Sequence, residues 1–184
     1  MGSVGYEYLL AYKITVPIYD YTVEFCRRHW TTLSSTRTHD QMVQAARSGM
    51  TNIPEGYTQK SLASYIKLAG VARASLEELL KDYLSYARHH QIQIWESERA
   101  KRDIGEIRDI WAILRKNSTL PSSPNFPSLP NNPEVAINLM ITLIKQASYI
   151  QDQLIRSLEA KHQKEGGFSE NLLKKRLEYR NRQS

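Results

Sequence analysis

The residues that can carry acid–base, nucleophilic or metal chemistry are few and poorly spaced for it. His89 and His90 are adjacent, and adjacent side chains on a helix point about 100° apart, so they do not converge on one ligand. Glu77 and Glu78 lack the Glu-x-x-His repeats that a di-metal helical site requires. Ser48 is followed by a glycine but has no glycine-flanked hydrolase elbow. The sequence therefore predicts no catalytic residue, no metal, no cofactor and no enzymatic activity.

The other histidines and the cysteine add no site. His29, His39 and His162 are isolated in the sequence, and helix ends or solvated surface account for them. Cys26 is the single cysteine, which excludes an internal disulfide and a Cys-based zinc site. The first thirty residues do not read as a secretory signal, and the most apolar stretch, 135–144, is far shorter than the roughly 20 residues of a membrane span. We expect a cytoplasmic protein with no membrane partner.

Positive charge is the feature that points to a partner. The formal net charge is +6 and the isoelectric point about 9.4, which favours an anionic ligand such as RNA or DNA. Solvated surface is the alternative explanation for every basic cluster. The candidate nucleic-acid-binding residues form one group around the loop before the second helix and one on the C-terminal tail: Arg27, Arg28, Arg37 and Arg47, then Lys174, Lys175, Arg176 and Arg180.

Apolar side chains at steps of three and four place these residues on helices. The first predicted helix covers 12–30 and kinks or begins near Pro17. The second begins at a capping box, Thr38 to Gln41, and ends at Gly56 as a left-handed terminator, with Pro54 bending its last turn. The expected buried stripes are Tyr12, Val16, Tyr19, Val23, Cys26 and Trp30 on the first helix, and Met42, Ala46, Gly49 and Ile53 on the second.

The strongest helical pattern follows, with a stripe of Leu62, Tyr65, Ala69, Ala72, Leu76, Leu79, Tyr83 and Ala87. A shorter helix is expected over 97–116, with Gly105 as its weak point. Prolines at every third position over 117–133 then predict a stiff polyproline linker. No segment shows the alternation of a β-strand.

Asn132 and Pro133 should cap the next helix, 133–163. Its stripe through Val135, Leu139, Leu143, Ala147, Ile150, Leu154 and Leu158 is joined by a second through Met140, Ile144 and Ile155. So wide an apolar face predicts more than one neighbour, including another copy of the chain. Gly166 and Gly167 should end this helix, and Ser169 should cap a basic last helix.

These elements predict an all-α fold: an up-and-down four-helix bundle of long helices with an extra short helix, a Pro-rich linker and a basic C-terminal helical tail. One domain would cover 1–165, linker included, and the tail 166–184. The pattern leaves open whether 97–116 or 133–163 supplies the fourth core helix.

Two segments, 45–56 and 72–79, carry a family resemblance. They resemble the four-helix-bundle family encoded in intervening sequences of 23S ribosomal RNA genes, which includes the accessory variability determinant of diversity-generating retroelements. That family's second helix ends in an R-S-x-x-x-N-I-x-E-G type motif, and its third carries A-x-x-S-L-x-E-L. The matching positions are Arg47, Ser48, Asn52, Ile53, Glu55 and Gly56, then Ala72, Ser75, Leu76, Glu78 and Leu79.

The resemblance covers roughly 6–90, and the chain past Asn117 looks like a subgroup with a C-terminal extension. Pro54 stands where the family usually has alanine. The resemblance implies a homo-oligomer, often a pentamer, and for the retroelement protein an RNA and a reverse transcriptase as partners. A structural role for the motif is the favoured interpretation: Arg47 and Glu55 as an ion pair, and Asn52 beside Gly56 as capping residues.

Two functions are therefore carried forward. The first is a non-enzymatic homo-oligomeric protein that binds RNA or DNA through its basic faces as an accessory factor. The second is a structural scaffold that recruits a protein partner. A salt series separates them, because phosphate contacts weaken steeply as salt rises.

Overall fold

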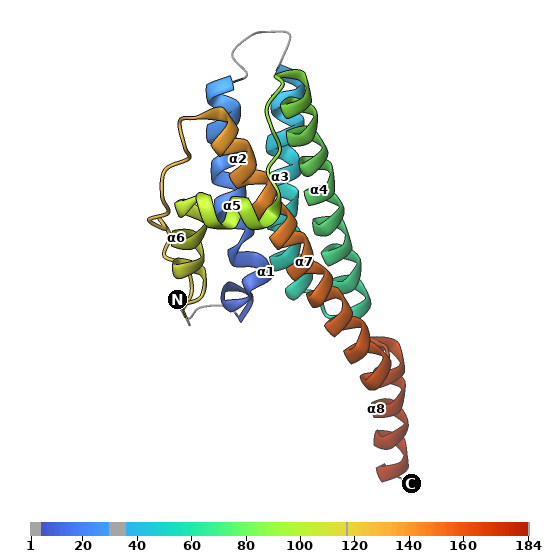
Figure 1. Cartoon of the computed structure of the whole chain (residues 1–184). Coiled ribbons are helices and arrows are strands. Elements are labelled where there is room, and N and C mark those ends of the chain that lie inside the picture. The colour runs from blue at the N-terminus through green and yellow to red at the C-terminus, as the bar shows by residue number, and fades with distance from the viewer. Residues whose placement is uncertain (1–4, 30–35, 117, 184) are drawn as a thin grey trace.

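The computed structural model describes residues 5–29, 36–116 and 118–183, and within these ranges the chain is helical with no strand (Figure 1). The predicted all-α class is confirmed. Trp30, the loop over 31–35 and Asn117 lie outside the described residues. The elements are a 3₁₀ turn η1 (Gly5–Tyr8) and the helices α1 (Leu10–Lys13), α2 (Thr15–His29), α3 (Thr36–Tyr57), α4 (Leu62–His89), α5 (Ser97–Asp103), α6 (Gly105–Leu114), α7 (Pro133–Glu165) and α8 (Phe168–Gln183).

Helices α2, α3, α4 and α7 run along the long direction of the molecule, and the short α5 runs across that direction (Figure 1). Helix α3 packs on α4 and α2, and α7 packs on α4 and α2. The short helices α5 and α6 contact α7 from outside this group. The segment 133–163 rather than 97–116 therefore completes the core, which resolves the alternative that the sequence left open.

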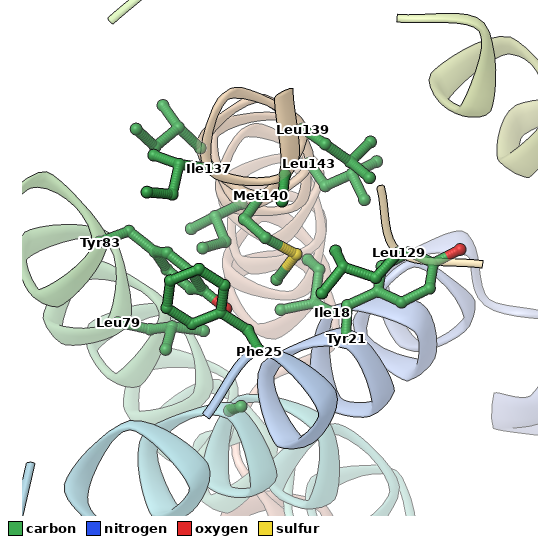
Figure 2. Packing of buried hydrophobic residues seen from close by; sticks show 14 of the residues in the cluster. Ile18, Tyr21, Phe25, Leu79, Tyr83, Leu129, Ile137, Leu139, Met140 and Leu143 are labelled. Carbon is green, nitrogen blue, oxygen red and sulfur yellow. The ribbon is translucent and has the colours of Figure 1, made fainter. Parts of the chain in front are cut away.

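The core gathers where α2, α4 and α7 meet (Figure 2). The side chain of Met140 of α7 points toward α2, where it lies between Phe25 and Ile18 (Figure 2). Tyr83 is fully buried, and its hydroxyl donates to Thr22 Oγ1 at 3.2 Å. Each such large apolar side chain contributes about 1.5–3 kcal/mol on burial. This junction fixes how α2 sits against the other helices.

The buried face of α2 differs from the predicted one. The predicted stripe included Val16, Tyr19 and Val23, but Val23 is exposed and the other two are only partly buried. Ile18, Tyr21 and Phe25 are buried instead, in line with Ile14 just before the helix and together with Cys26 as predicted. Both rows have helical spacing, so periodicity alone does not choose between them. The helix begins at Thr15, which places Pro17 in the first turn where proline is tolerated.

The stripe of α3 is as predicted, since Met42, Ala46, Gly49 and Ile53 are all buried. Its ends are not. The helix starts at Thr36 rather than at a Thr38 capping box, and it continues through Pro54 to Tyr57. Gly56 therefore lies inside the helix and is not a left-handed terminator.

Helix α4 follows its prediction closely. Ser61 caps it, with its side chain accepting from the Ser64 amide, and Tyr65 to Ala87 of the predicted stripe are buried. The segment 97–116 is not one helix. It breaks at Ile104, whose extended backbone separates α5 from α6 immediately before Gly105, the predicted weak point.

The Pro-rich linker is held against the first helices by side-chain hydrogen bonds. Tyr21 donates its hydroxyl to the Pro127 carbonyl at 2.5 Å, and buried Lys13 donates to the Ser118 carbonyl at 3.3 Å. Leu129 is buried in the main core. The linker is therefore part of the packed domain and returns the chain to the start of α7.

Asn132 caps α7 as predicted, accepting from the amides of Glu134 and Val135, and Pro133 occupies the first turn. Every residue of 136–144 is buried, including Met140 and Ile144 of the second stripe. Met140 and Ile144 are covered within one chain by neighbouring helices, and Ile155 is partly buried, so the width of the apolar face does not by itself require a second subunit.

Gly166 ends α7 with a φ of 76°, a left-handed conformation that favours glycine. Helix α8 begins at Phe168, so Ser169 lies inside it rather than at its cap. The Gly167 amide instead donates to the Glu170 carboxylate at 3.0 Å. Helix α8 extends beyond the end of the packed helices (Figure 1). The domain boundary drawn at residue 165 coincides with the end of α7.

Candidate nucleic-acid interface

The motif residues come together at the interface of α3 and α4. The hydroxyl oxygens of Ser48 and Ser75 lie 2.8 Å apart in a hydrogen bond. The Asn52 side-chain amide donates to Ser48 Oγ at 3.0 Å and to the Ser48 carbonyl at 2.9 Å. Small Gly49 packs directly on Leu76 of the same interface. These side chains hold two helices together, which supports the structural interpretation of the motif.

Gly56 has a different role from the predicted one. A Cβ at this position would lie 2.4 Å from Cδ2 of Tyr65 and 3.3 Å from Cβ of Leu68, so only glycine allows α3 and α4 to approach here. Arg47 and Glu55 are both described and both exposed, and no ion pair joins them. The predicted pairing of these two motif residues is wrong.

A cleft of about 840 Å³ runs along the same interface. Asp40, Glu78 and Asp82 line it, with Arg37 as its cation. Burial, and then the neighbouring Glu78, raise the pKa of the Asp82 carboxyl. Arg37 is therefore surrounded by carboxylates. Because carboxylates repel phosphate, the cleft has a lower affinity for a nucleic-acid backbone.

Arg27 and Arg28 both form ion pairs with a carboxylate of their own helix. Both donate to Glu24, with closest distances of 2.8 and 2.7 Å. Arg28 also donates to the carbonyls of Leu129 and Pro130, at 3.1 and 3.2 Å. Its guanidinium thus anchors the linker to α2, whereas Arg27 has 70% of its side chain exposed.

The second predicted basic group is placed differently. Lys174, Lys175, Arg176 and Arg180 are all exposed on α8. The helix also exposes apolar side chains, with Leu173 58% and Leu177 48% exposed. The two predicted basic groups therefore do not form one surface: the first is divided among α2, an acidic cleft and α3, and the second forms a projecting helix.

His29 and the buried Cys26 both pack against other residues of the chain. His29 is the last residue of α2, in keeping with the helix-end position predicted for it. Its ring lies 4.6 Å from Phe25 and 5.8 Å from Tyr86, and Tyr86 stacks on His90 at 4.1 Å. Burial, with the nearby Arg28 and His90, lowers the pKa of His29. Burial raises the pKa of the Cys26 thiol to about 12. Among the described residues no group of three or more His, Cys, Asp and Glu side chains is arranged to hold a metal ion.

The sequence did not predict a second cleft, which lies between α6 and α7 and is also lined by residues of α1 and α5. It also measures about 840 Å³, and its cations are Lys101, Arg108, Arg115 and Lys145. The spacing of Arg108 and Arg115 about Trp111 places all three on one face of a helix, and this was the available signal in the sequence. Helix α7, on the other side of the cleft, is distant from α6 in sequence, so the sequence carries no indication that a cleft forms between them.

Comparisons with protein-family models, with curated proteins and with solved structures returned no match. Within the part of the chain that the structure describes, no helix has the length and apolar character needed to cross a membrane.

Proposed function

We propose that this protein is a non-enzymatic binding protein that contacts RNA or DNA through α8. The observation that carries the proposal is the charge of this helix. Helix α8 contains five cationic side chains and two carboxylates, so it accounts for about half of the formal net charge of +6. The cations are Lys174, Lys175, Arg176, Arg180 and Arg182.

The placement of α8 makes it a better nucleic-acid-binding surface than the first basic group, Arg27, Arg28, Arg37 and Arg47. Lys174, Lys175 and Arg176 are consecutive and exposed, so they surround the helix rather than line one face. Such a distribution suits a phosphate backbone that approaches from several directions and carries no base-specific readout. We therefore expect binding that tolerates changes of nucleic-acid sequence.

We further propose that α2, α3, α4 and α7 form an up-and-down four-helix bundle of the ribosomal intervening-sequence type, and that the chain assembles into a homo-oligomer such as a pentamer. The hydrogen-bonded motif residues at the α3–α4 interface support the assignment. A symmetric assembly would repeat α8 around its axis and strengthen the local positive field. An accessory role in the cytoplasm beside a reverse transcriptase fits such a protein.

The test is a salt series of nucleic-acid binding. The full chain is titrated into fluorescein-labelled single-stranded RNA and into labelled duplex DNA, and the dissociation constant is measured at several salt concentrations. Each phosphate neutralised contributes about 0.7–0.9 to the slope of log affinity against log salt. The variant Lys174→Ala/Lys175→Ala/Arg176→Ala should lower that slope by about 2 and weaken binding at low salt.

The matched control removes the same charge elsewhere. Lys67, Lys81 and Arg88 are exposed on α4, and their triple alanine variant should keep nearly the whole slope of the unmodified chain. Circular dichroism checks that each variant retains its helix content. Equal slopes for the α8 variant and the unmodified chain contradict the proposal. Binding to anionic lipid vesicles without binding to RNA or DNA contradicts it as well and assigns α8 to a membrane surface.

A further inference from the structure

The cleft between α6 and α7 joins an apolar floor to a cationic rim. Ile107, Trp111 and Ile150 supply much of the apolar floor, and Ile107 is itself a buried side chain. Arg108 and Lys145 lie on the two helices that border the cleft, and both are exposed. None of the described residues that line the cleft is a carboxylate. An apolar surface bordered by charges of one sign selects partners of the opposite sign.

Two of the four cations, Lys101 and Arg108, have a carboxylate partner. Lys101 pairs with Glu98 at 2.7 Å, and Arg108 pairs with its neighbour Asp109 at 3.4 Å. In both pairs the side chains are exposed, and exposed ion pairs stabilise by less than about 1 kcal/mol. Lys145 is exposed on α7, and no carboxylate among the described residues forms an ion pair with it. The rim therefore remains able to attract an anionic partner.

We propose that this cleft binds an acidic amphipathic helix of a partner protein. The helix would place apolar side chains over Ile107 and Ile150 and carboxylates beside Arg108 and Lys145, as in other helix-in-groove complexes. Helix α6 has 10 residues, which gives a wall of about 15 Å and matches roughly three turns of a bound helix. This interface is independent of α8 and adds a protein partner to the proposed function.

The contacts of Trp111 disfavour a nucleic-acid strand in the cleft. Its indole N–H donates to Gln146 Oε1 at 2.8 Å, and the Arg115 guanidinium lies 5.3 Å from the centre of its ring. A ring held in this way offers little free face for a base to stack on, and sequence-tolerant single-strand binding relies on stacking. Tyr149, 65% exposed, remains as the one open aromatic ring of the lining.

The experiment measures binding of defined helical peptides to the full chain by fluorescence anisotropy. The probe is a labelled peptide of about 14 residues with Leu at helical spacing and Glu elsewhere, and a second probe carries Lys in place of Glu. The unmodified chain should bind the Glu/Leu peptide and not the Lys/Leu peptide. The variant Arg108→Glu/Lys145→Glu should weaken Glu/Leu binding at least about tenfold and gain binding of the Lys/Leu peptide.

Two further variants make the test specific. Lys67→Glu/Lys81→Glu changes the same charge on α4 and should bind the Glu/Leu peptide like the unmodified chain. Ala112→Glu places a carboxylate in the cleft at an exposed helical position and should also abolish binding. Equal effects of the α4 and cleft double variants overturn the proposal. The proposal is also overturned if neither peptide binds and the cleft variant loses RNA binding. If only the α8 variant loses RNA binding, the proposal for the cleft is unaffected.

Discussion

The hydroxyl oxygens of Ser48 and Ser75 lie 2.8 Å apart across the interface of α3 and α4. Ser48 belongs to the R-S-x-x-x-N-I-x-E-G type segment and Ser75 to the A-x-x-S-L-x-E-L segment, so one hydrogen bond joins the two motifs that carry the family resemblance. Asn52 extends the contact by donating to Ser48. The motif spacing is therefore explained by helix pairing, with no catalytic step required.

We predict that Ser75→Ala lowers the free energy of unfolding by about 1 kcal/mol, because it removes a mostly buried hydrogen bond between side chains. Urea unfolding followed by circular dichroism measures the change. Ser157→Ala is the control, since Ser157 is exposed and bonds only to a carbonyl of its own helix. A loss no larger than that of the control would show that the Ser48–Ser75 contact does not stabilise the interface.

Substitution of two glycines by alanine distinguishes the effect of close packing on stability from the effect of helix propensity. Gly56→Ala should destabilise the protein by about 1–3 kcal/mol, because the added Cβ meets the Tyr65 ring at 2.4 Å. Gly70→Ala on α4 meets nothing within 4 Å and should stabilise by up to about 1 kcal/mol. Thermal unfolding of the two variants gives midpoints on opposite sides of the unmodified protein. Midpoints shifted in the same direction would contradict the close approach of α3 and α4 at Gly56.

Asn138 is buried on α7 and fixes the segment before α5. Its carboxamide accepts from the Trp95 amide at 2.7 Å and donates to the carbonyls of Gln93 and Glu134, at 2.9 and 2.8 Å. Asn138→Ala leaves these groups without their partner and should cost about 2 kcal/mol or more. Loss of the Asn132 cap in Asn132→Ala should cost about 1 kcal/mol.

Hydrogen exchange distinguishes these two asparagine variants. Asn138→Ala should accelerate exchange of the Trp95 amide, whereas Asn132→Ala should leave that amide protected and expose the first turn of α7. If Asn138→Ala leaves both the free energy of unfolding and the Trp95 exchange rate unchanged, the hydrogen bonds of Asn138 do not hold this segment.

Glu24 should make stability depend on pH at the acid end. Hydrogen bonds from Arg27 and then Arg28 hold the pKa of this carboxyl down to about 2, below its ordinary value near 4.3. Since the pKa is lower in the folded state, the stabilisation is complete above about pH 5 and is lost as the pH falls toward 2. Because the pair is partly exposed, we expect an effect of about 1 kcal/mol or less.

Glu24→Gln tests this dependence. The variant should be less stable than the unmodified protein at neutral pH, and the difference should shrink between pH 5 and pH 2. The control Glu159→Gln replaces an exposed carboxylate of α7 and should show no comparable pH-dependent difference. A difference between Glu24→Gln and the unmodified protein that stays constant down to about pH 2 would exclude the Arg27 and Arg28 contacts as its cause.

The sequence alone determined those elements whose signals are local. The α4 stripe from Tyr65 to Ala87, the α3 stripe through Met42 and Ile53, the Asn132 cap and the Gly166 terminator all depend on residues within a few positions of one another. Helical periodicity and cap chemistry act over that range, so these features were predictable. The all-α class follows from the same local signals.

Tertiary structure alone decided the features in which two local patterns compete or distant residues meet. Helix α2 has two apolar rows, and packing against Met140 and Tyr83 selected the one with Ile18 and Phe25. Gly56 had the chemistry of a terminator, but contact with Tyr65 makes it a packing residue. The two clefts, the capture of Arg28 by the linker and the cover over the second stripe of α7 each join residues far apart in sequence. Periodicity within one helix carries no information about which neighbour will cover it.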